Sequence, residues 1–302
     1  MKNNHYLQSK ALSALTYLHK VIPDKCYIAI QYRIKMGYWM RFSHPMTFTE
    51  KLQWLKLYNR RPEYTNLVDK YAVKKYVTQM VGQEYIIPTY AVYDRVEDID
   101  WDNLPNQFVM KTTNGGGGVN VFICKDKSTI DKKEVSRMMI QSMRYSIYKT
   151  YGEWPYKGVK PRIIVEELLQ SSTGDIRDYK FYCFNGVPRL LLVASNRFTS
   201  HNFNYLDIDY NPITLTSTCG KPIDDIGNKP ENYDIMVNLA KKLSQNIPHV
   251  RVDLYNCDGK VYFGELTFFD SSGYDNLNSE EWNRRLGDWI TLPLKCNYIV
   301  PN

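Results

Sequence analysis

Four consecutive glycines, Gly115–Gly118, limit what this chain can form more than any other feature of its sequence. They lie within "FVMKTTNGGGGVNVFI" (residues 108–123), where strand-forming residues flank them on both sides and Lys111 precedes them. Glycine loses more conformational entropy on folding than any other residue, so four together are costly unless something uses the bare backbone. A hairpin tip would use one or two of them, whereas a chain of phosphate groups would use all four.

The residues around the glycines predict one strand before them (107–113) and one after them (119–126), because β-branched and aromatic residues dominate both segments. The glycines therefore join two strands. P-loops and Rossmann folds both place a helix directly after their glycines, so this junction excludes the usual form of either motif.

The remaining pattern predicts helices first and strands later. Apolar residues recur at helical spacing in 10–22, 47–61 and 66–82, and Thr47 with Glu50 forms a capping-box signature. Further helices are expected at 128–151 and 232–245. Strands, mostly antiparallel, are expected at 85–94, 162–169, 178–186, 189–197, 250–259 and 260–269. The sequence therefore predicts an α+β fold.

Composition narrows the class of protein. With 302 residues and 43% hydrophobic content, the chain can form one large or two modest domains, and its net charge of +7 favours anionic partners. Six scattered cysteines without a C-x-x-C pair argue against a zinc ribbon and for a reduced compartment. We see neither a signal peptide nor eighteen uninterrupted apolar residues, so we expect a cytoplasmic protein.

Two carboxylates stand inside the last two predicted strands. Asp253 and Glu265 lie among apolar residues, and the turn at Asp258–Gly259 joins their strands, so a hairpin brings both onto one face. Carboxylates in such surroundings need a counter-charge or a metal ion, and Mg²⁺ binds through one or two carboxylates plus phosphate oxygens. Thr267 shares the face of Glu265. The alternative is a pair of solvated strand positions.

Five cations accompany these groups: Lys70, Lys111, Lys180, Arg197 and Arg251. Singly, each is an ordinary surface charge. Together with the glycine loop and two carboxylates they indicate a triphosphate site, in which amides and lysines hold phosphate oxygens and an arginine stabilises the transferred group.

The order of these pieces resembles the ATP-grasp superfamily. The pieces are "FTEKLQWLKLYNR", "LVDKYAVKKYV", "VMK…GGGG", "VEELL", "DYKFYCFNG", "RVD" and "GELTFF". Within the superfamily the chain is most similar to the subfamily linked to teichuronopeptide and other surface-polysaccharide biosynthesis, over residues 41–273. The resemblance implies an ATP-grasp fold, in which two α+β subdomains clasp ATP, with a helical N-terminal extension.

The resemblance also implies four segments. They are the helical extension (1–65), a pre-ATP-grasp segment (66–107), a small subdomain with the glycine-rich loop (108–167) and a large subdomain with the metal site (168–302).

Residue by residue, the resemblance implies these roles. Lys70 and Lys111 contact ATP phosphates, and Gly115, Gly116, Gly117 and Gly118 form a loop that closes over them. Glu166, Glu167 and Leu169 line the adenine site, and Asp178 approaches the ribose. Lys180 and Arg197 face phosphates or acceptor, Arg251 stabilises the acyl phosphate, and Asp253 and Glu265 hold Mg²⁺. One departure is Thr267, where superfamily ligases usually have asparagine, which puts a two-metal geometry in doubt.

The function that follows is an ATP- and Mg²⁺-dependent carboxylate–amine ligase. By analogy, its acceptor is a carboxylate-bearing sugar or glycan such as a uronic acid, and its nucleophile is an amino acid or another amine. No nucleic acid is expected as a partner, whereas a peripheral contact with the inner face of the membrane, or with a polysaccharide-assembly enzyme, is left open for the N-terminal helices.

Three other classes remain as alternatives. A phosphotransferase would use the same phosphate site and pass the γ-phosphate to a hydroxyl. A glycosyltransferase would use the "DID" of Asp207–Asp209 as a metal motif, although "DID" before Asn211-Pro212 is more often a turn. A glycan- or nucleotide-binding scaffold would be a non-enzymatic relative with a degraded site.

Overall fold

The computed structural model describes residues 2–116, 121–172, 174, 176–195, 202–217, 221–223, 226–275 and 277–295, with the side chains of residues 2–5 and 7 excepted. Three predicted site residues, Gly117, Gly118 and Arg197, lie outside these ranges.

Two antiparallel sheets organise the molecule. The smaller has the order β1-β4-β2-β3 and consists of β1 (Thr89–Tyr93), β2 (Phe108–Thr112), β3 (Phe122–Cys124) and β4 (Ile163–Glu166). The larger has the order β7-β6-β5-β8-β9 and consists of β5 (Arg177–Phe184), β6 (Val187–Ser195), β7 (Asn202–Asp207), β8 (His249–Cys257) and β9 (Lys260–Thr267). The expected strand–loop–strand junction is present, because β2 pairs antiparallel with β3 across the glycine run.

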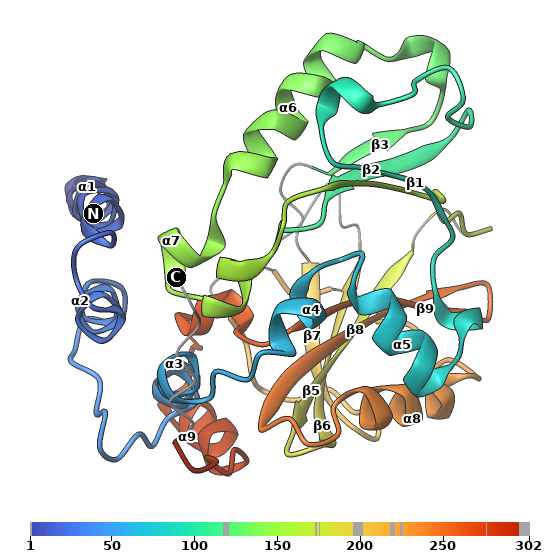
Figure 1. Ribbon diagram of the computed structural model, residues 1–302. Coiled ribbons are helices and arrows are strands. Elements are labelled where there is room, and N and C mark those ends of the chain that lie inside the picture. The colour runs from blue at the N-terminus through green and yellow to red at the C-terminus, as the bar shows by residue number, and fades with distance from the viewer. Residues whose placement is uncertain are drawn as a thin grey trace.

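Helices surround these sheets. The α-helices are α1 (Lys2–Leu18), α2 (Asp24–Met36), α3 (Phe48–Tyr58), α4 (Tyr64–Val68), α5 (Val73–Val81), α6 (Lys132–Arg144), α7 (Ile147–Tyr151), α8 (Tyr233–Leu243) and α9 (Glu280–Asp288). Short 3₁₀ turns are η1 (Gln83–Tyr85), η2 (Val96–Asp98), η3 (Lys127–Thr129), η4 (Trp154–Gly158) and η5 (Asp270–Gly273). In Figure 1 the small sheet and α6 lie above the large sheet, and α1 and α2 stand to one side.

Among the described residues, three of the four apolar clusters lie between these layers. The largest joins the five-stranded sheet to α3, α4, α5, α8 and α9, and a second packs α6 against the small sheet. A third belongs to the N-terminal layer and includes Leu15, Tyr27, Ile28 and Tyr32. At the start of α3 the predicted capping box is confirmed, since Thr47 accepts from the Glu50 amide and the Glu50 carboxylate accepts from the Thr47 amide.

The single helix predicted over 66–82 is wrong. The chain forms α4 and α5 with a break between them, because Asp69 is extended and its carboxylate accepts the amides of Tyr71 and Ala72 at 2.8 and 2.9 Å. The amide of Lys70 donates to Thr113 O at 3.1 Å. Lys70 thus lies in the break, next to the strand that leads to the glycines, and not within a helix.

The expected helix over 128–151 also divides, into α6 and α7, with Ser146 capping the second piece through the Lys149 amide. Three elements that the pattern did not indicate are present: α2, β7 and α9. Among the described residues, no helix combines the length and the apolar character needed to cross a membrane.

Candidate active site

One face of the large sheet carries a row of charged side chains across three strands. Lys180 on β5 pairs in register with Asp253 on β8, which pairs with Glu265 on β9. The Lys180 Nζ lies 2.7 Å from Asp253 Oδ2 and 3.4 Å from Asp178 Oδ2. The predicted hairpin is present, and a bulge at Gly264 shifts its register so that Asp253 and Glu265 lie side by side.

Arg251 is the central residue of the next row on the same face of the sheet. It lies opposite Tyr182 and Thr267 in register, and only 11% of its side chain is exposed. Its Nε and Nη2 bind the two oxygens of Asp253 at 2.7 and 2.8 Å, and its Nη1 binds Asp270. Such a planar fork, held on two sides by carboxylates, keeps the guanidinium in a fixed position.

Thr267 completes this row. Its hydroxyl accepts from Arg251 Nη2 at 3.3 Å and donates to Glu265 Oε1 at 3.3 Å. The residue that departs from the superfamily pattern thus contacts both a predicted metal ligand and the predicted catalytic arginine.

Lys70 reaches this face from the break between α4 and α5. Its Nζ lies 2.7 Å from Glu265 Oε2. Burial alone would raise the pKa of Glu265, but Lys70, Lys180 and Arg251 outweigh it and hold that pKa well below the ordinary value. The same balance applies to Asp253, whose pKa burial would raise and Arg251 and Lys180 lower.

A second charged cluster lies on the small sheet. Glu166 is 3% exposed at the end of β4. Its two carboxylate oxygens form ion pairs with Lys111 Nζ on β2 and Lys74 Nζ on α5, each at 2.5 Å. Burial alone would raise the pKa of Glu166, but the two lysines outweigh it and lower that pKa. Glu166, which the resemblance assigns to the adenine site, here has its carboxylate bound to a predicted phosphate ligand, Lys111.

The start of the glycine loop is closely packed. A Cβ on Gly116 would lie 3.1 Å from Ile147 Cδ1 and 3.9 Å from the Tyr156 hydroxyl, and one on Gly115 would lie 3.3 Å from Thr112 Oγ1. These two positions leave little room for a side chain, which gives one physical reason for glycine there.

The other predicted nucleotide contacts lie where the chain passes from one sheet to the other. The Glu167 amide donates to Pro88 O at 3.0 Å. Leu169 packs on an apolar cluster of Ile87, Cys257 and Tyr262. Asp178, 4% exposed, points its carboxylate toward Lys180. An apolar wall beside polar backbone suits a flat heterocyclic base.

The metal motif considered for a glycosyltransferase is a turn. Asp207 Oδ1 accepts the amides of Asp209 and Asn211 at 3.0 and 2.8 Å, and Oδ2 accepts from the Asn211 side chain at 3.0 Å. This carboxylate closes the loop after β7, so the structure supports the turn and not a metal site there.

Hard oxygen donors make the large-sheet face suitable for Mg²⁺. Asp253 and Glu265 are adjacent carboxylates, the ligand type that Mg²⁺ prefers. Within the described ranges, no group of three or more His, Cys, Asp or Glu residues is arranged to hold a metal ion. An ion held by Asp253 and Glu265 would take its remaining ligands from water and phosphate oxygens.

Sequence reasoning missed Lys74 and Tyr182. Lys74 lies on α5 and Lys70 in the break before that helix, so no local pattern in the sequence marks Lys74 as a site residue. Tyr182, two residues after Lys180 on β5, donates to Asp270 Oδ2 at 2.6 Å.

A separate cavity of about 360 Å³ lies between α1, α2 and residues 150–151, and none of the predicted site residues lines it.

Solved structures with a similar arrangement are distant. D-alanine–D-alanine ligase from Bacillus anthracis shares 16% identity over 67% of this chain and 57% of its own length, with a TM-score of 0.39. The Helicobacter pylori D-alanine–D-alanine ligase shares 14% over 80% of this chain and 69% of its own length, at 0.44. A RimK domain ATP-grasp protein from Sphaerobacter thermophilus shares 11% over 77% of this chain and 70% of its own length, at 0.41.

These likenesses are too weak to carry the assignment, and the chain spans little more than half the length of the first. Among curated proteins none matches significantly. The family model described as TupA-like ATPgrasp, by contrast, matches residues 50–291, which include both charged clusters and the glycine run. The predicted resemblance and the ATP-grasp fold are thereby confirmed: the chain belongs to the TupA-like ATP-grasp family.

Proposed function

We propose that this protein is an ATP-dependent carboxylate–amine ligase that forms an amide through an acyl phosphate. Membership of the ATP-grasp family supports the use of ATP and the ligase class. The observation that carries the proposal is the position of Arg251. Asp253 and Asp270 hold its guanidinium in the row next to Asp253 and Glu265, the two carboxylates suited to a metal ion.

In this proposal the cations exchange partners when ATP binds. Lys111, with Lys74 beside it, and Lys70 neutralise phosphate oxygens that replace Glu166 and Glu265 as their partners. The glycine loop covers the phosphates, Glu167 and Leu169 border the adenine, and Asp178 approaches the ribose. Lys180 keeps Asp253 ionised and oriented, and Arg197 stays a prediction for the acceptor side.

Asp253 and Glu265 would hold Mg²⁺, with Thr267 beside them. When bound, Mg²⁺ supplies positive charge that stabilises the phosphate oxygens during transfer. Because Lys70 leaves Glu265 for a phosphate, that carboxylate becomes available at the moment when nucleotide and metal arrive together.

The reaction proceeds in two balanced steps. A carboxylate oxygen of the acceptor attacks the γ-phosphorus, the bond to the β,γ-bridging oxygen breaks, and ADP leaves. The amine nitrogen then attacks the acyl carbon, the carbon–oxygen bond to phosphate breaks, and the leaving phosphate takes up the proton that the nitrogen loses. Arg251 neutralises the oxyanion of the tetrahedral species, a contact made only after phosphoryl transfer.

The acceptor is a uronic-acid-type carboxylate in surface-polysaccharide biosynthesis, and the nucleophile is an amino acid or a similar amine. Support for this class comes from the family resemblance alone, because fold does not specify substrate.

A stoichiometry experiment tests the proposal. Candidate uronic acids and amines are screened for phosphate release, and products are identified by mass. A ligase yields ADP, free phosphate and amide in equal amounts, and only when acceptor and amine are both present. ADP with a stable phosphorylated product and no free phosphate would identify a phosphotransferase instead.

A further inference from the structure

The positive charge of this chain is concentrated at one end. Residues 1–46 contain seven of the 39 Lys and Arg residues but only one of the 32 acidic residues, Asp24. This segment therefore carries +6 of the net charge of +7, and the other 256 residues are close to neutral. That distribution is independent of the two charged clusters at the active site, which lie beyond residue 46.

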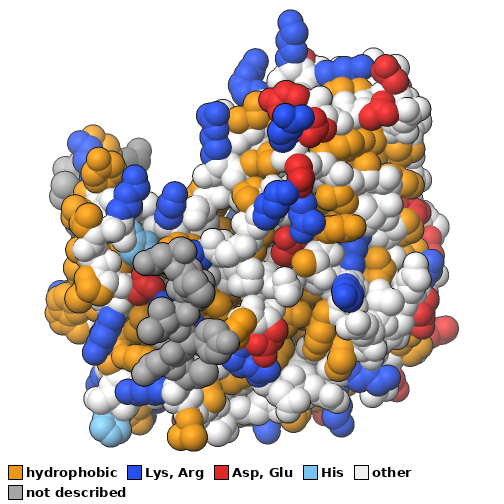
Figure 2. Space-filling view, in the orientation of Figure 1, with side chains coloured by type: hydrophobic (Ala, Val, Ile, Leu, Met, Phe, Trp, Pro, Cys, Tyr) orange, Lys and Arg blue, Asp and Glu red, His pale blue; other side chains and the backbone are white. Residues whose placement is uncertain are grey.

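Exposed apolar side chains are concentrated in the same segment. Among the described residues, fourteen large hydrophobic side chains are exposed, and eight of them lie between residues 6 and 46. These eight are Tyr6, Tyr17, Leu18, Val21, Ile30, Tyr38, Trp39 and Met46. Figure 2 shows hydrophobic and basic side chains next to one another over α1 and α2.

On α1 and in the turn after it, basic and apolar side chains lie next to one another. Tyr6 and Tyr17 are 60% and 78% exposed, and their spacing of eleven residues places them on one side of α1. Lys10 lies on the same side, with its Nζ 4.5 Å from the centroid of the Tyr6 ring. In the turn, Val21 is 78% exposed, and Lys20 Nζ lies 5.8 Å from the Tyr17 ring.

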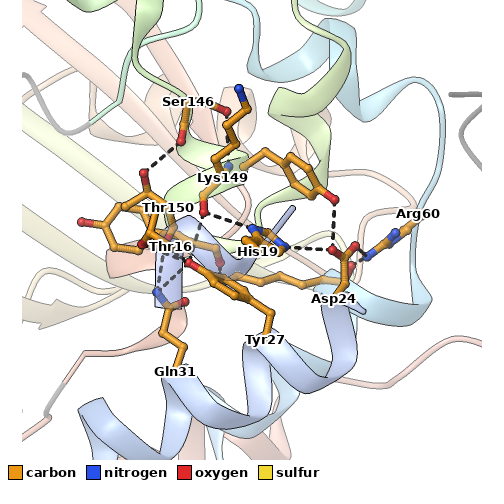
Figure 3. A network of polar contacts seen from close by, with 12 residues as sticks. Thr16, His19, Asp24, Tyr27, Gln31, Arg60, Ser146, Lys149 and Thr150 are labelled. Carbon is orange, nitrogen blue, oxygen red and sulfur yellow. Dashed lines mark hydrogen bonds and ion pairs between the residues drawn. The ribbon is translucent and has the colours of Figure 1, made fainter. Parts of the chain in front are cut away.

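The opposite side of α1 is buried at Leu15, which is 5% exposed. In the turn after α1, the His19 ring stacks on Tyr27 at 3.6 Å, as Figure 3 shows. Its Nδ1 lies 3.0 Å from Lys149 O, and its Nε2 lies 3.0 Å from Asp24 Oδ1. Arg60 also binds Asp24, so the one acidic residue of this segment is already engaged. The outer face therefore points away from the catalytic layers.

We propose that this outer face, comprising Tyr6, Lys10, Tyr17, Lys20 and Val21, docks on an anionic lipid surface together with the exposed Tyr38 and Trp39 that follow α2. Such a surface takes both kinds of group at once. Apolar and aromatic side chains enter the boundary between headgroups and acyl chains, and lysines bind the anionic headgroups. Tyr and Trp suit that boundary because each has an apolar body and a polar tip.

Other occupants fit less well. An RNA would bind the cations but leave aliphatic side chains such as Val21 and Leu18 without partners. A second copy of the chain would place one +6 segment against another, and like charges across an interface are repulsive. The inference does not depend on the proposed ligase activity, since no residue of the active site takes part.

The test measures binding of the full chain to vesicles by flotation. Vesicles contain either phosphatidylcholine alone or phosphatidylcholine with about 30 mol% phosphatidylglycerol. We expect binding to the anionic vesicles only, weakened when salt rises from about 0.1 to about 0.5 M. Emission from Trp39, which is 61% exposed, should shift to the blue on binding, and Trp39→Phe should remove that shift.

Two variants separate the contributions. Tyr17→Ser with Val21→Ser removes apolar contacts, and Lys10→Glu with Lys20→Glu reverses two charges; each should weaken binding by about tenfold or more. The matched controls are Val187→Ser with Ile235→Ser, at exposed apolar sites elsewhere, and Lys125→Glu with Lys133→Glu. All four variants should keep the circular dichroism spectrum of the parent.

Several results would overturn the proposal. They are absence of binding to anionic vesicles, equal binding to neutral ones, equal weakening by the control variants, or binding of single-stranded RNA without binding of lipid.

Discussion

The two charged clusters differ in which charge is shared. On the small sheet, one carboxylate, Glu166, binds two lysines, Lys74 and Lys111. On the large sheet, two adjacent carboxylates, Asp253 and Glu265, bind Lys70, Lys180 and Arg251. Both clusters are buried enough that each charge depends on its partners.

This difference indicates which ligand each cluster suits. Two lysines around one carboxylate suit a phosphate, whereas two adjacent carboxylates suit a metal ion. The glycine run follows the strand that carries Lys111, and Lys70, whose amide binds Thr113 O at the end of that strand, pairs with Glu265. A metal–triphosphate complex placed between the clusters would bind to both.

The largest effect on turnover is expected at the large-sheet cluster, at Asp253 and Glu265. Glu265→Gln and Asp253→Asn each remove a charged hard-ion ligand, so turnover at ordinary Mg²⁺ concentrations should be abolished. ADP release under steady-state conditions measures this, with Glu63→Gln, a surface carboxylate paired with Arg61, as the control. If both site variants kept full activity, the metal assignment would be wrong.

The next effect separates catalysis from binding. Arg251→Ala should lower kcat by about 10²–10³-fold, because the proposed oxyanion contact is absent from the ground state. The affinity for ATP, measured by calorimetry, should change only a few-fold. Arg251→Lys keeps a charge beside Asp253 and Asp270 and serves as the control for folding. Equal losses of kcat and ATP affinity in Arg251→Ala would assign this residue to nucleotide binding.

A smaller effect is expected at the lysine-rich cluster. Lys111→Ala should weaken ATP binding by about 1.5–3 kcal/mol, the usual range for a hydrogen bond to a charged group. Lys125→Ala, at an exposed position near the end of β3, should leave the affinity unchanged. A folded Lys111→Ala protein with the parent affinity would remove Lys111 from the phosphate site.

The smallest effect concerns stability and pH. The folded pKa of Glu166 lies below its ordinary value of 4.5, so its ion pairs stabilise the fold above that pH and lose this contribution as pH falls toward the folded pKa. Glu166→Gln should lower the free energy of unfolding by about 2 kcal/mol at pH 7 and by less below pH 4. Urea denaturation at both pH values measures the difference, and a constant difference would contradict the lowered pKa.

The sequence predicted part of the large-sheet cluster. The two-residue turn at Asp258–Gly259 indicates the hairpin of β8 and β9, and Arg251 lies on the face of Asp253 because it is two residues before it. The pairing of Asp253 with Glu265 also needs a bulge at Gly264, since a regular register would place Gly264 opposite Asp253. That bulge, and the pairing of β5 with β8 that brings Lys180 to Asp253, were not indicated by local pattern.

The small-sheet cluster depends on contacts distant in sequence. Lys74 meets Glu166 only because α5 packs near the end of β4, and no local pattern distinguishes it from a surface lysine. The break at Asp69 was missed for a related reason. Apolar spacing continues through 66–82, whereas the break is fixed by Asp69 bound to Arg162 at 3.0 Å and by Lys70 bound to Thr113. Tertiary contacts overrode helix periodicity at the point that places Lys70 in the site.

The most direct test of the ligase mechanism uses an acceptor labelled with ¹⁸O in its carboxylate. An acyl phosphate route transfers one labelled oxygen into the released phosphate, since the carboxylate oxygen that attacks the γ-phosphorus leaves with it. We predict labelled inorganic phosphate, in amounts equal to the amide formed, by mass spectrometry. Amide formed together with unlabelled phosphate would contradict the mechanism.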